Sequence, residues 1–404
     1  MNACTTTAPR AAQRTLWITL WAAVAMLLSA CVTQPPGAAV SNDALPYDQA
    51  IVLATDALVK QTQTLPAFLA NLDAKLNKRA VVLDPSLDSG SGQQTAATQL
   101  LDKSVTDRMT SKFEQFEVLP FRAVNLAKAQ YLLTGTLTRA PQAYRINLAL
   151  TDLKSGSVVA QSSALARDSG VDMSPLPYYR DSPVLVKDKV IDGYVRTSST
   201  APGQRADALY LERIATATVI NEATLLYNAE EYQEALGQYR SALATPAGEQ
   251  MRVLNGIYLA NVKLNRPAEA EQAFGRVVAF GIAANELGVK FLFNPGSTDF
   301  WSDPKVSGPY GMWLRQIAKE GGAAKVCMDI VGHTSKTGSG PVNDALSLKR
   351  AGYIKQKLGS EAAEFANRTK PQGMGFRQNI VGSGTDDAVD ALDRRVEFKI
   401  TPCG

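Results

Sequence analysis

The sequence predicts an α+β protein of several domains, with an N-terminal α+β sheet domain, a helical repeat-like middle and a C-terminal βαβαβ domain with a mixed sheet. Short apolar runs of strand type alternate with helical patterns over 46–168. Apolar residues at helical spacing fill 205–284, and strand and helix patterns alternate again over 285–404. The 404 residues also exceed the ~100–200 of a usual single domain.

The composition is that of an ordinary globular protein, with 45% hydrophobic and 20% charged residues. The formal net charge of +4 is small for a chain of this length and gives no support to a nucleic-acid partner.

The first 30 residues have the pattern of a secretory signal. Arg10 and Arg14 precede an apolar run, Leu16–Leu28, which is shorter than the ~20 residues needed to span a bilayer. We therefore expect 1–30 to be a signal peptide, and 31–45, which contains Pro35-Pro36-Gly37, to be a flexible tether.

The signal ends in Leu28-Ser29-Ala30-Cys31, which resembles the bacterial lipobox. The resemblance implies that Cys31 is lipidated and that several acyl chains anchor the protein, since one chain binds a membrane only marginally. Val32 follows Cys31 where an Asp would direct retention at the inner membrane, so the resemblance implies an outer-membrane lipoprotein facing the periplasm. The alternative is an ordinary cleaved signal that contains a Cys by chance.

The domain at 46–168 is predicted from two initial helices followed by five strands, with a third helix after the first strand. The helices are expected at Tyr47–Lys60, Leu65–Leu76 and Thr95–Phe113, and the strands at Ala80–Leu83, Phe116–Phe121, Tyr131–Thr138, Tyr144–Leu153 and Ser157–Ala166. Lys154-Ser155-Gly156 indicates a hairpin between the last two strands.

Residues 79–166 resemble periplasmic lipoprotein domains of the FlgO, CsgG and LpoB type. The resemblance is carried by Arg79-Ala80-Val81-Val82-Leu83-Asp84, Ala129-Gln130-Tyr131-Leu132-Leu133-Thr134-Gly135-Thr136-Leu137, Tyr144-Arg145-Ile146-Asn147-Leu148 and Asp152-Leu153-Lys154-Ser155-Gly156-Ser157-Val158-Val159. It implies a domain that binds other envelope proteins or assembles into rings.

Residues 169–204 are rich in Pro, Ser, Asp and Tyr and are predicted to form a linker, whereas 205–284 is predicted to be helical. Ala235 recurs as Ala270, an offset of 35, close to the ~34-residue tetratricopeptide period. This resemblance implies a surface that binds a partner protein. The alternative is a helical hairpin packed on its neighbours.

The last domain, 285–404, resembles the OmpA-like domain, the peptidoglycan-associating module shared with Pal and MotB. Its expected elements are strands at Val289–Phe293, Ala324–Gly332, Met374–Val381 and Arg395–Ile400, helices at Tyr310–Glu320 and Pro341–Leu358, and a short helical piece from Asp386. The resemblance is carried by Phe291-Leu292-Phe293, Ile330-Val331-Gly332-His333-Thr334, Asn343-Asp344-Ala345-Leu346-Ser347-Leu348-Lys349-Arg350-Ala351, Gly373-Met374-Gly375 and Asp393-Arg394-Arg395-Val396-Glu397.

This resemblance implies a binding site for the diaminopimelate-containing stem peptide of peptidoglycan. The candidate residues are Thr334, Ser335, Asn343, Arg350 and Arg394. A planar guanidinium such as that of Arg350 suits a carboxylate, and an amide such as that of Asn343 both donates and accepts. The alternative for Arg350 is a solvated charge on a helix.

One departure from the family concerns the ligand's ammonium group. The family has Gly-His-Thr-Asp where this chain has Gly332-His333-Thr334-Ser335. Loss of the acid would cost ~1–3 kcal/mol of binding, unless Asp344, Asp386 or Asp387 replaces it.

Cys4 leaves with the signal and Cys31 is expected to be lipidated, so Cys327 and Cys403 remain, either as a disulfide or as two free thiols. The OmpA-like resemblance favours the disulfide, because the family's last strand runs antiparallel beside the second.

Neither a catalytic site nor a metal or cofactor site is predicted. His333 is the only His, and the chain has neither a Gly-x-Ser-x-Gly elbow nor a His-Glu-x-x-His zinc motif. Two functions are therefore expected: an outer-membrane scaffold bound to peptidoglycan, or an interaction subunit of an envelope machine whose OmpA-like domain binds wall weakly or not at all.

Overall fold

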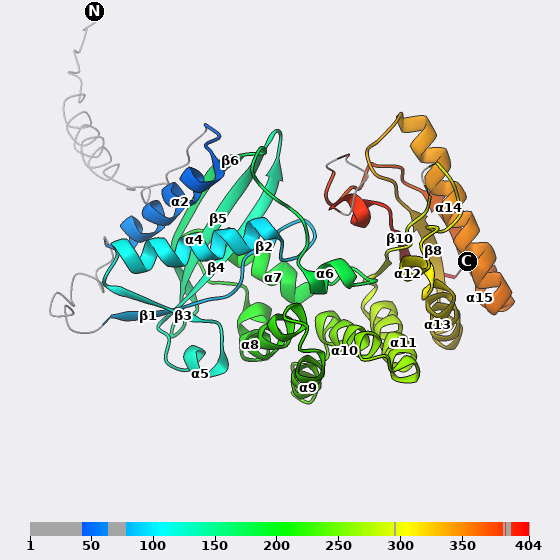
Figure 1. Ribbon diagram of the computed structural model, residues 1–404, viewed down its shortest axis with the longest axis horizontal. Helices are drawn as coiled ribbons and strands as arrows, with labels where there is room; N and C mark the ends of the chain where they lie inside the picture. Colours follow the sequence, from blue (N-terminus) through cyan, green and yellow to red (C-terminus); the bar gives the residue numbers. More distant parts are fainter. Residues whose placement is uncertain (1–42, 64–77, 295, 383, 385–388, 404) are drawn as a thin grey trace, which may run out of the picture. The chain divides into compact units, whose positions relative to one another are not determined.

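The computed structural model describes residues 43–63, 78–294, 296–382, 384 and 389–403 (Figure 1). Several predictions fall outside these ranges: the signal 1–30, Cys31, most of the tether, the helix at 65–76, and Asp386 and Asp387. Among the helices of the described ranges, none combines the length and apolarity that a bilayer crossing requires.

The N-terminal domain is built on a mixed sheet of order β3-β1-β4-β5-β6, with the two-residue β2 paired to β4. The strands are β1 (Arg79–Leu83), β2 (Leu87–Asp88), β3 (Phe116–Pro120), β4 (Tyr131–Ala140), β5 (Ala143–Asp152) and β6 (Ser157–Arg167). β1 runs parallel to β3 and β4, and β4, β5 and β6 form antiparallel hairpins. All five predicted strands of this domain are confirmed.

Helices cover both faces of this sheet. α2 (Tyr47–Thr62) and α4 (Ala96–Lys112) pack on one face, where Ile146, Leu148 and Leu150 of β5 join their core. Thr95 begins α4 with a capping box, in which its hydroxyl accepts from the Thr98 amide. The short α5 (Ala123–Leu126) connects β3 to β4. Because both faces of the sheet are covered, β5 is buried at nearly every position.

The prediction of a linker at 169–204 is wrong. This segment forms α6 (Pro177–Asp181) and α7 (Lys189–Ser198), and α7 covers the second face of the N-terminal sheet. Its Tyr194 hydroxyl accepts from the Gly135 amide at 2.9 Å. The Asp and Ser residues that suggested a linker serve as helix caps. Asp188 accepts from the amides of Val190 and Ile191, both at 3.0 Å.

Four helices follow in sequence, and each packs on the next: α8 (Ala208–Asn228), α9 (Tyr232–Leu243), α10 (Met251–Lys263) and α11 (Pro267–Ala284). The residues matched at an offset of 35 lie in α9 and α11, and all are buried. Their core is continuous with that of the C-terminal domain through α11 and α13 (Tyr310–Ala323). The helices thus pack on their neighbours, and the tetratricopeptide resemblance stays a prediction.

The C-terminal domain has a four-stranded mixed sheet of order β7-β10-β8-β9. The strands are β7 (Leu287–Val289), β8 (Cys327–Gly332), β9 (Thr369–Gly373) and β10 (Val396–Thr401). Besides α13, the helices of this domain are α12 (Pro304–Ser307), α14 (Gly340–Glu361), α15 (Ala363–Asn367) and the 3-10 helix η1 (Val389–Asp393). β10 is antiparallel to β7 and β8, whereas β9 is parallel to β8.

Three strands of this domain differ from prediction. The strand expected at Met374–Val381 lies earlier, at Thr369–Gly373, because the chain turns at Gly375, whose φ is +51°. The strand expected from Ala324 begins only at Cys327, because Lys325 also has a positive φ of 51°. The first strand ends at Val289 and does not reach Phe293.

A disulfide joins Cys327 and Cys403, with 5.2 Å between their Cα atoms. Cys327 opens β8 opposite Thr401 of β10, and Cys403 follows two residues later. The bridge therefore locks the last strand to its antiparallel neighbour.

We expect the double substitution Cys327→Ser and Cys403→Ser to lower the free energy of unfolding by about 4 kcal/mol, since the bridge closes a loop of 76 residues. Urea denaturation of oxidised protein measures this change. Reduction of the wild type should reproduce it, and an equal midpoint with and without reductant would contradict the prediction.

We expect Gly256→Ala to destabilise the helical region by ~1–3 kcal/mol, because the added Cβ would lie 2.4 Å from the Tyr239 ring. Gly237→Ala is the matched control. Its Cβ meets no atom within 4 Å, and alanine favours a helix by ~1 kcal/mol over glycine. Thermal unfolding should shift in opposite directions for the two variants.

Candidate functional site

Four of the five predicted binding residues, Thr334, Ser335, Asn343 and Arg350, lie at the end of β8 or on α14. Gly332 ends β8, and a Cβ at this position would lie 2.2 Å from the Ser347 carbonyl oxygen. Only glycine allows the strand to approach the helix so closely. The residues that follow, His333 to Ser335, are thereby held against the N-terminal half of α14.

Thr334, Ser335 and Asn343 form one side of this site. Asn343 donates through Nδ2 to the carbonyls of Thr337, at 2.7 Å, and Ser339, at 3.1 Å. The hydroxyls of Ser335 and Thr337 are 3.2 Å apart. Asn343 thus holds the loop that leads from β8 into α14, and all three predicted residues are buried.

Gly375 links this side to the loop after β9. Its carbonyl accepts from the Thr334 amide at 3.0 Å, and its own amide donates to Ser347 Oγ at 2.9 Å. Motifs that lie about 40 residues apart in the sequence are therefore joined through backbone hydrogen bonds. Ser347 belongs to the site by its contacts, although we predict no binding role for it from the sequence.

Arg350 lies two turns beyond Asn343 on the same buried face of α14. It is 3% exposed, and its Nε and Nη2 donate to the carbonyls of Ser297, at 3.1 Å, and Asn294, at 3.3 Å. Its guanidinium also lies 4.9 Å from the centre of the Phe293 ring. The alternative of a solvated helix charge is wrong. Arg350 is a buried cation that holds the loop after β7.

Beneath the site lies a second buried arginine. Arg395 donates to Glu397 Oε1 through both Nε, at 2.8 Å, and Nη2, at 2.5 Å, and it also donates to the carbonyls of Leu392 and Gln378. Burial raises the pKa of Glu397, but the nearby His333 and Arg395 lower it more, so the net pKa is well below its usual range. The Glu397 carboxylate therefore stays ionised and neutralises Arg395.

His333 is a packing residue. It is 1% exposed, and its Nε2 lies 3.6 Å from Glu397 Oε1, beyond hydrogen-bond distance. Burial lowers the pKa of His333, which keeps the ring neutral at physiological pH.

Asp393 is a further functional candidate that we do not predict from the sequence. Its carboxylate accepts from the amides of Ile380 and Gly382, both at 2.7 Å, and of Val381 at 3.0 Å. It thus shapes the 380–382 loop. The motif residue that we do predict, Arg394, is half-buried and lines a separate groove.

Asp344, one of the acids that could replace the family's Asp, is paired with Arg377 in the structure. This carboxylate is bound by Arg377, which also donates to the Gly373 carbonyl at 3.2 Å. The other two candidates, Asp386 and Asp387, lie outside the described residues.

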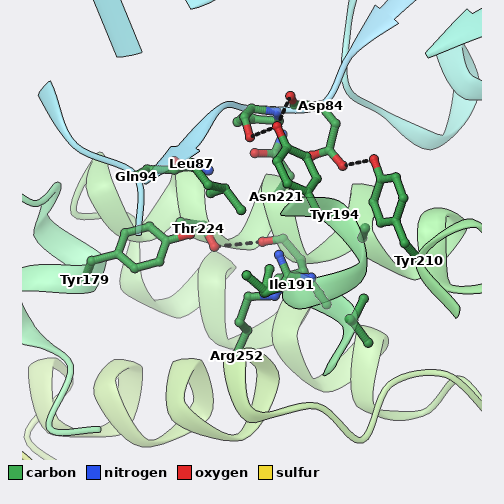
Figure 2. Close-up of a pocket in the computed structure, with 14 residues that line it drawn as sticks. Asp84, Leu87, Gln94, Tyr179, Ile191, Tyr194, Tyr210, Asn221, Thr224 and Arg252 are labelled. Atoms are coloured by element: carbon green, nitrogen blue, oxygen red, sulfur yellow. Dashed lines mark hydrogen bonds between the residues drawn. The ribbon is translucent and has the colours of Figure 1, made fainter. Parts of the chain in front are cut away.

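A second polar cluster lies between the N-terminal sheet and the helices. Figure 2 shows Asp84, at the end of β1, facing the Tyr210 hydroxyl, which donates to its carboxylate at 2.6 Å. Tyr194 and Arg252 line the same cavity. The cavity volume is only about 20 Å³, enough for a single water molecule. This cluster therefore joins two parts of the fold and is too small for a ligand.

No protein-family model matches the chain, and no curated protein sequence matches it. Among solved structures, the chain is similar to the peptidoglycan-associated lipoprotein from Burkholderia pseudomallei, at 22% identity and a TM-score of 0.23, over 28% of this chain and 89% of that one. It is also similar to a putative MotB-like protein from Desulfovibrio vulgaris, at 19% identity and a TM-score of 0.24, over 35% of this chain and 97% of that one. A third likeness is to the OmpA-like domain of FopA1 from Francisella tularensis, at 16% identity and a TM-score of 0.20, over 28% of this chain and 74% of that one.

We expect stability to fall as the pH rises through 6, because burial raises the pKa of Asp84 to about 6 against the opposing effects of Tyr210 and Arg252. The protonated carboxyl is favoured in the folded state, so its contribution is complete below pH ~4 and is lost above pH ~6. Across this pH range the Asp84 carboxyl should change the free energy of unfolding by up to roughly 3 kcal/mol. Asp84→Asn should remove this change.

The free energy of unfolding, measured in urea between pH 4 and 7, checks this prediction. Asp107→Asn is the control, since Asp107 is exposed and pairs only with Lys103 in the described structure. A pH dependence as steep in Asp84→Asn as in wild type would contradict it.

Proposed function

We propose that this protein is a lipid-anchored scaffold of the bacterial envelope whose C-terminal domain binds peptidoglycan non-covalently. In this proposal Cys31 carries the lipid in the outer membrane, and 285–404 reaches the wall through the stem peptide. The role is one of binding and not of catalysis. The N-terminal and helical regions would dock other envelope proteins.

The observation that carries the proposal is the meeting of separate motifs at one place. The end of β8, the first half of α14 and the loop at Gly375 are joined by hydrogen bonds among Thr334, Ser347 and Gly375. Arg350 places a permanent positive charge on the same face of α14. A planar guanidinium suits the carboxylates of a stem peptide, because its fork can bind both oxygens of a carboxylate.

A second candidate is an interaction subunit that binds wall weakly or not at all. Two observations favour it. Ser335 carries no charge for a ligand's ammonium group. Arg350 already donates to two carbonyls of the 294–297 segment, so a ligand carboxylate must compete with these carbonyls for the guanidinium.

Sedimentation of the mature protein with insoluble sacculi tests the proposal. We expect wild type in the pellet and Arg350→Ala in the supernatant, with Lys349→Ala as the control, because Lys349 is an exposed cation on the same helix. Arg350→Lys keeps the charge but loses the planar fork, and should bind weakly. Thermal unfolding of each variant separates lost binding from lost folding.

We expect Ser335→Asp to strengthen sacculus binding by roughly ten-fold or more, since a charge-assisted bond to the ligand's ammonium is about twice as strong as a neutral one. Ser335→Asn has the same size without the charge and should leave binding unchanged. If wild type stays in the supernatant and Ser335→Asp does not bring it down, wall binding is refuted and the second candidate stands.

A further inference from the structure

A groove of about 600 Å³ lies away from the β8–α14 site. One wall is the end of α10, with Leu259, Val262 and Lys263, and a second is the segment 179–183 around the end of α6. The third wall comes from the C-terminal domain, from Lys290 to Trp313. A volume of several hundred Å³ is typical of sites that bind small ligands or short peptides.

The base of the groove is aromatic and rigid. Trp313 donates through Nε1 to the Tyr258 hydroxyl at 2.8 Å, and its ring stacks on Phe274 with centroids 5.6 Å apart. Tyr310 packs beside it at 4.8 Å. Hydrogen bonds and stacking hold these rings in a rigid floor that is almost fully buried, with Trp313 6% and Tyr310 2% exposed.

The rim of the groove keeps apolar groups partly open to solvent. Val262 is 46% exposed, and Trp301 is half-buried. The Trp301 backbone is held by a bond from its amide to the Leu292 carbonyl at 3.0 Å. An occupant with an apolar side chain would therefore cover surface that water now contacts.

The charge of the groove is strongly one-sided. Among its described residues are five cations, Arg180, Lys263, Lys290, Lys305 and Arg394, and a single acid, Asp181. Asp181 is already bound by Lys263 at 2.8 Å, by Arg180 at 3.0 Å and by the Tyr227 hydroxyl at 3.0 Å. Cations therefore outnumber acids in the described lining of the groove, which favours an anionic occupant.

Lys290 is the cation placed deepest in this arrangement. Its Nζ donates to the carbonyls of Tyr179, at 3.3 Å, and Arg180, at 3.2 Å. Burial lowers its pKa to about 8, which Asp181 opposes only in part. A carboxylate bound nearby would stabilise the ammonium form.

We propose that this groove binds a short acidic segment of a partner protein, with an apolar or aromatic side chain against Val262 and Trp301 at the rim and a carboxylate among Lys263, Lys290 and Lys305. A peptide fits better than a nucleic acid or a membrane, because the cations surround an enclosed apolar hollow and do not form an extended basic face. The proposal goes beyond the wall-binding function and does not depend on it.

Fluorescence anisotropy with labelled hexapeptides tests this proposal on the full-length mature protein. The probe alternates Glu and Phe, and its controls alternate Lys with Phe and Glu with Gly. We expect the Glu/Phe peptide to bind at least ten-fold more tightly than either control, because charge and apolar surface are both required. Binding should weaken as the salt concentration rises.

Variants locate the site. Lys305→Glu reverses a charge on the exposed α12 and should weaken binding of the Glu/Phe peptide about ten-fold. Lys128→Glu is the control, since it makes the same change on an exposed residue of the N-terminal domain. It should leave the affinity for the peptide within two-fold of wild type. Lys290→Gln keeps a donor for the two carbonyls and should weaken binding as well. Sacculus sedimentation of Lys305→Glu should match wild type, which separates this site from the wall site.

Three results would each overturn the proposal. These are equal affinity for the Lys/Phe peptide, equal affinity for the Glu/Gly peptide, and an affinity for the Glu/Phe peptide that Lys305→Glu does not change. Displacement of the peptide by millimolar inorganic phosphate alone would likewise show that the groove selects anions and not peptides.

Discussion

The close contact between β8 and α14 is the constraint on which the C-terminal domain depends. Gly332 allows the strand to press against the Ser347 carbonyl, where any Cβ would overlap it. This contact brings His333 beneath the site and Thr334 beside Gly375. Because the disulfide ties the other end of β8 to β10, the strand is held at both ends, and the binding residues are carried on a rigid element.

The C-terminal domain contains two buried arginines, Arg350 and Arg395, which bind different kinds of group. Arg395 is neutralised by Glu397, whereas the described partners of Arg350 include the carbonyls of Asn294 and Ser297 and the Phe293 ring. Glu397 thus neutralises the Arg395 guanidinium, and the Arg350 guanidinium holds the segment 294–297 against α14.

The helical middle joins the two sheet domains through packed side chains. Its core runs from Tyr178 through α9, α10 and α11 into β7 and α13. On the other side, Tyr210 of α8 bonds to Asp84 at the end of β1. The groove with the aromatic base follows from this packing, since its walls come from α10, the segment after α6 and the C-terminal domain.

Local patterns were enough to predict the strands of the N-terminal sheet and the helical middle, because these depend on residues close in sequence. The candidate residues around Gly332 came from the family resemblance, and the order of the strands in each sheet was visible only in the structure. The linker prediction at 169–204 failed because Tyr178, Tyr179 and Tyr194 are buried by contacts with distant segments. Tertiary structure alone decided that Arg350 already bonds to a loop more than 50 residues away, and that five cations meet at one groove. Such contacts depend on how the elements pack, and no short stretch of sequence contains that information.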